Sequence, residues 1–94
     1  MPRRTTHPQR QRCLEIIGDE QLVFAEGYDE AIIGVGWRDG VPIVAYDTQR
    51  VIAILCRRDG MTQEDAEEFF DYNIQGAWIG EATPIFVDGL SVRR

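Results

Sequence analysis

Residues 59–84, DGMTQEDAEEFFDYNIQGAWIGEATP, carry the local signals that decide the fold. Gly60 is typical of a helix end, and Thr62 is a typical N-cap of the next helix. Apolar side chains then recur at helical spacing and predict one buried face, formed by Ala66, Phe69, Phe70 and Ile74. Gly76 ends this helix, and a short strand over 85–87 follows.

Upstream of this stretch, the sequence predicts a β-hairpin and a helix. The run 31–37 alternates apolar residues with glycine, 41–46 reads as a second strand, and the Asp-Gly pair at 39–40 is typical of a two-residue turn. Asp47 is a typical N-cap, and the helix that it begins runs to residue 58. This helix is expected to bury one apolar stripe, which comprises Val51, Ile52, Leu55 and Cys56.

Two details of the hairpin predict its surroundings. Gly34 and Gly36 share one face of the first strand, so we expect another element, most simply a helix, to approach the backbone there. Pro42 has no N–H to donate, so we expect the second strand to lie at an edge or to turn this nitrogen outwards.

The N-terminal part of the chain is polar at first and then helical. Residues 1–8 are predicted to form a flexible basic arm, and residues 9–17 a short amphipathic helix. The run 20–26 is ambiguous between a helical turn and a strand, and we favour the helix. This order of elements predicts the α+β class, with a small antiparallel sheet (the hairpin plus a C-terminal strand) packed against two to three helices. A single domain over 9–90 and a C-terminal tail at 91–94 are expected.

The 94-residue chain has a net charge of −6, with an acidic body and arginines at both ends. Such a body repels phosphates, so we do not expect a nucleic-acid partner. No apolar run is long enough to span a membrane, and no apolar segment follows the basic N-terminus as in a secretory signal. We therefore expect a soluble, cytoplasmic protein with no membrane partner.

Residues for well-known catalytic and metal chemistry are few. Cys13 and Cys56 are not spaced as a zinc motif, and His7 is the only histidine, so both cysteines are expected to be reduced and structural. Ser91 is the only serine, and neither a nucleophile motif nor a phosphate-binding glycine loop occurs. We therefore expect no catalytic residue, no metal, no cofactor and no enzymatic activity.

One face of the helix after Thr62 is densely acidic. Four acids with the spacing i, i+3, i+4 and i+7 form this acid stripe, namely Glu64, Glu67, Glu68 and Asp71. Three interpretations compete: a docking surface for a basic partner, a face that is either simply solvated or paired with Arg57, Arg58 or the N-terminal arm, and a metal site. Divalent ions need acids that converge from more than one element, which disfavours the metal site.

Two tryptophans lie beside glycines, Trp37 next to the hairpin turn and Trp78 between Gly76 and Gly80. In a small domain such side chains more often cover the core, whereas an exposed one is typical of an interface anchor. Trp37 and Trp78 are therefore the candidate apolar anchors of a protein-binding surface whose rim is the acid stripe.

Residues 27–87 resemble a group of small uncharacterised proteins that are common in bacteriophage and prophage genomes. The resemblance is carried by the runs GYDEAIIGVG, VPIVAYD and DGMTQEDAEEFFDYNIQGAWIGEATPIFV. It implies a compact accessory protein made in the host cytoplasm during infection, and such proteins often bind a host factor. It implies no activity and no site residue.

The leading hypothesis is a small acidic, non-enzymatic binding module that docks on a basic surface of a host protein. It would act there as an inhibitor or modulator, for example of host defence. The first alternative is a protein that sequesters a small ligand in a glycine-lined pocket. The second is a structural or assembly component of the phage particle, which predicts a homo-oligomer joined through the strand of Pro42 or that of Ile85.

Overall fold

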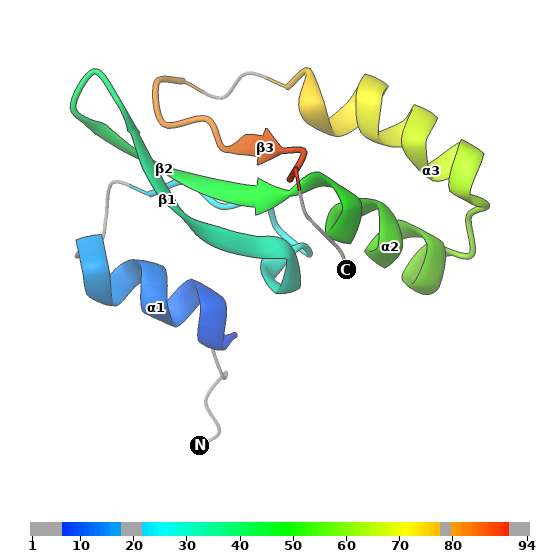
Figure 1. Cartoon of the computed structure of the whole chain (residues 1–94), viewed down its shortest axis with the longest axis horizontal. Helices are drawn as coiled ribbons and strands as arrows, with labels where there is room; N and C mark the ends of the chain where they lie inside the picture. The colour runs from blue at the N-terminus through cyan, green and yellow to red at the C-terminus, as the bar shows by residue number, and fades with distance from the viewer. Residues whose placement is uncertain (1–6, 18–21, 78–79, 91–94) are drawn as a thin grey trace.

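Figure 1 shows a three-stranded sheet with helices packed around it, in a computed structural model that describes residues 7–17, 22–77 and 80–90. The α-helices are α1 (Pro8–Ile17), α2 (Thr48–Asp59) and α3 (Gln63–Phe69), and a π-helix, η2 (Phe70–Gln75), continues α3. The strands are β1 (Ile32–Arg38), β2 (Val41–Asp47) and β3 (Ile85–Val87), and a 3-10 turn, η1 (Asp29–Ala31), precedes β1. The predicted α+β class is confirmed.

The sheet is mixed, because β3 does not run in the predicted direction. β1 and β2 form an antiparallel hairpin whose turn residues, Asp39 and Gly40, both have positive φ angles, 51° and 83°. β3 instead lies parallel to β2, with Phe86 opposite Tyr46. Two helices separate β2 from β3 along the chain, and such a crossover brings the chain back to the end of the sheet from which β2 started. The expectation of a purely antiparallel sheet is therefore wrong for β3.

Pro42 lies in the central strand, so the expectation that its strand is at an edge of the sheet is wrong. The sheet order is β1-β2-β3, and β3 pairs with β2 only from Ala45 onwards. Pro42 faces Trp37, one pair beyond the Arg38–Val41 pair that flanks the turn. In a two-residue hairpin this second pair lacks hydrogen bonds, so the proline nitrogen points away from β1 to a part of β2 without a partner strand. The other expectation, that the Pro42 nitrogen points outwards, describes this position.

The core joins one face of the sheet to α2 and α3. Its fully buried side chains include Ile32, Val44, Tyr46, Val51 and Leu55. From the π-helix, the Phe70 ring meets Phe86 edge to face, with centroids 5.2 Å apart. Tyr46 adds a polar contact inside this core, because its hydroxyl accepts a hydrogen bond of 2.7 Å from the Ala25 backbone N–H. Of the side chains predicted to be buried on the two helices after the hairpin, five are confirmed, namely Val51, Ile52, Leu55, Ala66 and Phe70. The other three, Cys56, Phe69 and Ile74, are half-buried and pack against the core.

The predicted helix ends are present in the structure. The Asp47 carboxylate accepts from the Arg50 N–H at 2.9 Å and begins α2, and Gly60 ends it with a left-handed φ of 70°. The Thr62 hydroxyl accepts from the Asp65 N–H at 3.1 Å and begins α3. None of the helices in the described ranges is long and apolar enough to cross a membrane.

Two further expectations about local structure are wrong. Of the run 20–26, residues 22–26 form neither a helix nor a strand, and residues 20 and 21 lie outside the described residues. The described segment packs against the core, and the Ala25 N–H donates to the Tyr46 hydroxyl. Gly34 and Gly36 are not crowded, since a Cβ added at either would meet no atom within 4 Å. Both glycines lie on the face of the sheet turned away from Val44 and Tyr46.

The predicted boundary of the N-terminal arm, at residue 8, is wrong, because His7 and Pro8 belong to the start of α1. Pro8 is the first residue of α1, and the His7 backbone carbonyl accepts from the Gln11 N–H at 2.9 Å. The His7 Nδ1 atom also accepts a bond of 3.1 Å from the Gln9 N–H, so His7 belongs to the start of the helix. Residues 1–6 of the predicted arm and the predicted tail at 91–94 lie outside the described residues.

Candidate functional site

All four side chains of the acid stripe are exposed, on α3 and the first turn of η2. Glu67 accepts a hydrogen bond of 2.8 Å from the Gln63 amide, which lies on the same helix face. In residues 7–17, 22–77 and 80–90, no arginine forms an ion pair with Glu64, Glu67, Glu68 or Asp71. The stripe therefore carries four negative charges that this part of the chain does not neutralise.

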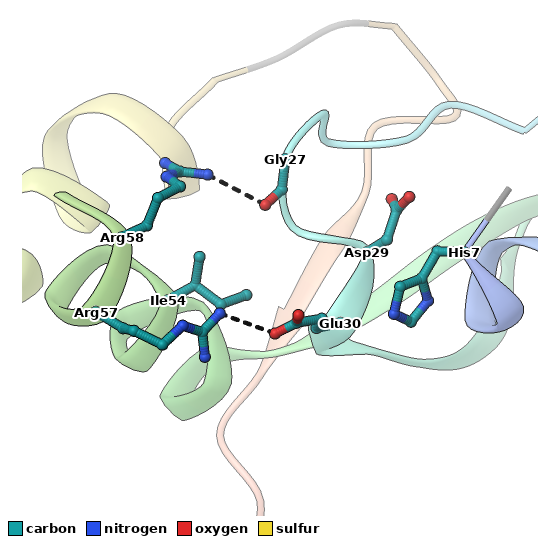
Figure 2. Close-up of a pocket in the computed structure, with 7 residues that line it drawn as sticks. All are labelled: His7, Gly27, Asp29, Glu30, Ile54, Arg57 and Arg58. Carbon is teal, nitrogen blue, oxygen red and sulfur yellow. Dashed lines mark hydrogen bonds and ion pairs between the residues drawn. The ribbon is translucent and has the colours of Figure 1, made fainter. Parts of the chain in front are cut away.

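The expected pairing of the stripe with Arg57 or Arg58 is wrong. Arg57 donates to Glu30 at 2.9 Å, and Arg58 pairs with Asp59 at 3.0 Å. Both side chains leave the last turn of α2 towards the segment that precedes β1, as Figure 2 shows, and not towards α3.

The acid stripe separates two hollows on the flanks of α3. The first, which we call the outer groove, has a volume of about 380 Å³ and is lined by Met61, Asp65, Glu68, Phe69, Tyr72 and Asn73. The second, of about 260 Å³, lies between α2 and α3 and contains Glu67, Asp71 and Asp88 among its lining residues. The structure thus assigns Glu68 to one hollow and the Glu67–Asp71 pair to the other, whereas Glu64 lines neither.

The outer groove combines acids with exposed aromatic surface. The Tyr72 side chain is 80% exposed, and Met61 and Phe69 are half-buried side chains that pack on the core. Asp65 and Glu68 are exposed and supply the only charges of its lining. Sequence reasoning missed Tyr72, although its position four residues after Glu68 places it on the same helix side.

The two tryptophans do not join this site. Trp37 is 65% exposed near the tip of the hairpin, so the prediction that it more often covers the core is wrong for this residue. It lines neither of the hollows beside the acid stripe. Trp78 lies outside the described residues.

A wider hollow of about 450 Å³ lies between the C-terminal end of α2 and the segment before β1 (Figure 2). Its arginines are already engaged: Arg57 with Glu30, and Arg58 with the Gly27 carbonyl at 3.2 Å and the Tyr28 hydroxyl at 3.3 Å. Hydrogen bonds to Asp59 and Tyr28 raise the pKa of Arg58, and the contact with Arg58 lowers the pKa of the Asp59 carboxyl. This network joins α2 to the chain before β1.

The same hollow offers no recognisable catalytic or metal chemistry. His7 is its one imidazole, and the Nδ1 atom of that ring is occupied by the Gln9 N–H. The charged lining is balanced, with Asp29 and Glu30 against Arg57 and Arg58. Across the ranges that the structure describes, no group of three or more His, Cys, Asp and Glu residues is arranged to hold a metal ion.

Replacing Gly27 by alanine should lower the free energy of unfolding by about 1–3 kcal/mol. Gly27 has a φ of 95°, and an added Cβ would lie 3.0 Å from the Arg58 guanidinium nitrogen that donates to the Gly27 carbonyl. Urea denaturation measures the loss, with Gly34→Ala as the control, because a Cβ at Gly34 meets nothing and its φ is not positive. Equal stability of the two variants would contradict the left-handed backbone at Gly27 and the close approach of Arg58 to it.

Comparison with known proteins identifies no relative. A scan against protein-family models, a search of the curated proteins and a search of the solved structures each found no match. Membership of a phage protein group therefore stays a prediction, and the function has to be argued from the residues of the site.

Proposed function

We propose that the protein is a non-enzymatic binding module that docks through α3 on a basic surface of another protein. The observation that carries the proposal is the acid stripe, which is exposed and lacks an arginine partner in the described ranges, next to a groove with an exposed tyrosine. Following the phage resemblance, the partner is a host cytoplasmic protein that this module inhibits or modulates.

The electrostatics of α3 support a partner of opposite charge. Glu64 with Glu68 and Glu67 with Asp71 are like charges one helical turn apart, and each such pair costs about 0.2–0.5 kcal/mol. The positive end of the helix dipole offsets acids only in the first turn, where Glu64 and Asp65 lie. A basic partner would relieve the remaining repulsion, and the concentrated negative field would speed its association.

Neutralising part of the stripe tests the proposal. A variant with Glu67→Gln, Glu68→Gln and Asp71→Asn keeps the side-chain shapes and removes three charges. Both it and the wild type would be used as bait in host lysate at about 0.05 M salt, where surface charges are weakly screened. We expect a partner retained by the wild type and lost by the variant, with its purified complex weakened tenfold or more at about 0.5 M salt.

A matched control separates a specific surface from overall acidity. The variant Glu15→Gln, Asp39→Asn and Glu81→Gln removes the same number of charges from exposed positions outside α3. It should capture the partner as well as the wild type does. Equal loss in both triple variants, or an affinity that does not change with salt, would overturn docking through the acid stripe.

A further inference from the structure

We propose that the outer groove is an arginine-binding site, in which a guanidinium from the partner stacks on the Tyr72 ring and pairs with Asp65 or Glu68. This inference rests on the proposed function and adds the anchor residue that the partner must present. Its occupant is an exposed, arginine-bearing basic segment of another protein.

The molecule already binds two of its own arginines in this way. The guanidinium of Arg10 lies 4.2 Å from the centroid of the Phe24 ring and pairs with Asp29 at 3.0 Å. The guanidinium of Arg58 lies 5.1 Å from the centroid of the Tyr28 ring and, as described above, pairs with Asp59. In both cases one aromatic ring and a carboxylate hold a planar cation, by a cation–π contact and a charge-assisted hydrogen bond.

The outer groove contains the same two components without an arginine from the described part of the chain. Tyr72 supplies an exposed ring, and Asp65 and Glu68 supply carboxylates in the same lining. Met61 and Phe69 supply apolar surface for the methylene stem of a long basic side chain. The remaining polar group is committed, because the Asn73 amide donates to the Phe69 carbonyl at 3.2 Å.

Two other hollows in the described part of the chain lack this combination. The hollow beside Arg57 and Arg58 contains balanced charges and cations that are already paired. The one beside Glu67 and Asp71 is acidic, but its aromatic residue, Phe70, is only 3% exposed. A surface with both an open ring and unpaired acids prefers arginine to lysine, because the flat guanidinium stacks and forms a fork of hydrogen bonds that an ammonium cannot.

The test uses short peptides that differ at one position. The probe is the capped peptide Gly-Lys-Lys-Arg-Lys-Lys-Gly, and its comparison peptides carry lysine or citrulline in place of the arginine. Calorimetry at about 0.05 M salt should rank the arginine peptide first. Tyr72→Ala should weaken the arginine peptide about three- to thirtyfold, the range of exposed to desolvated cation–π contacts, and should leave the lysine peptide almost unchanged.

Two further variants distinguish the ring from the charge. Tyr72→Phe keeps a stacking surface and should keep most of the preference for arginine, which also guards against a folding defect in Tyr72→Ala. Glu64→Gln removes a charge from the same helix outside the groove and should weaken both basic peptides equally.

The outcomes separate this inference from the proposed function. Equal binding of the arginine and lysine peptides, insensitive to Tyr72 but lost in the Glu67, Glu68 and Asp71 triple variant, would overturn the arginine site and leave acidic docking intact. Binding of the arginine peptide that survives the triple variant but is lost in Tyr72→Ala would count against docking through the acid stripe and would leave the arginine site, paired through Asp65, intact. An affinity for the arginine peptide that rises in an Arg93→Ser, Arg94→Ser variant by more than the affinity for the lysine peptide would assign the groove to the chain's own terminal arginines and would overturn a partner as its occupant.

Discussion

Replacing Phe70 by alanine should lower the free energy of unfolding by about 3–5 kcal/mol. Phe70 is 3% exposed, and its ring packs on Phe86 of β3, which in turn lies 5.5 Å, centroid to centroid, from the Tyr46 ring of β2. Removing the ring opens a cavity where the π-helix meets two strands. Since a domain of this size has about 5–15 kcal/mol of stability in total, this loss removes a large part of it.

Phe69 supplies a control of the same residue type at the next position. Its side chain is half-buried and lines the outer groove, so Phe69→Ala leaves less of a cavity and should cost less than half as much. Urea denaturation followed by circular dichroism measures the free energy of unfolding of both variants. If Phe70→Ala does not fold, Phe70→Leu serves as a milder third variant. A loss for Phe70→Ala no greater than that for Phe69→Ala would contradict the packing of η2 on β3.

Signals that act over a few residues were predictable from the sequence. The cap residues Asp47 and Thr62 satisfy backbone N–H groups three residues ahead, and the Asp-Gly turn uses positive φ angles that other residue pairs rarely adopt. These contacts depend only on neighbouring residues, so residue type and spacing are sufficient to locate them.

Features set by distant segments were not predictable in the same way. The direction of β3 depends on how α2 and α3 return the chain to the sheet. The spacing of the glycines at 34 and 36 could not show whether another element approaches the backbone there, and only the packing of the chain leaves room for a Cβ at both positions. Residues 22–26 similarly make contacts with distant segments, including a hydrogen bond from Ala25 to the hydroxyl of Tyr46, more than twenty residues away.

The same distinction between local and distant contacts applies to the candidate site. Helical spacing was enough to predict that Glu64, Glu67, Glu68 and Asp71 share one side of α3. It could not show that Arg57 reaches Glu30 rather than the stripe, because that contact joins elements 27 residues apart. The role of the acids in binding stays a prediction, and the outer groove adds Tyr72 as an anchor candidate nearer to them than Trp37.

Raising the pH from about 10 to about 12 should destabilise the protein through Tyr46 by about 2 kcal/mol. The side chain is fully buried, and burial raises the pKa of its hydroxyl to about 12 from its ordinary value near 10. Between these values the unfolded chain releases a proton that the folded chain keeps. The stabilisation is therefore complete below pH 10 and is lost as the pH rises through 12.

The variant Tyr46→Phe isolates this effect. At pH 7 it should be less stable than the wild type by about 1–3 kcal/mol, because the buried Ala25 N–H loses its acceptor. It carries no hydroxyl to ionise, so its stability should fall less steeply above pH 10 and the two curves should converge near pH 12. Burial also raises the pKa of the Cys13 thiol, but that contribution is common to both proteins and cancels in the difference. If the stabilities of the wild type and Tyr46→Phe changed in parallel from pH 7 to 12, the Tyr46 hydroxyl would ionise as easily in the folded protein as in the unfolded chain. That result would contradict the burial of this side chain in the core.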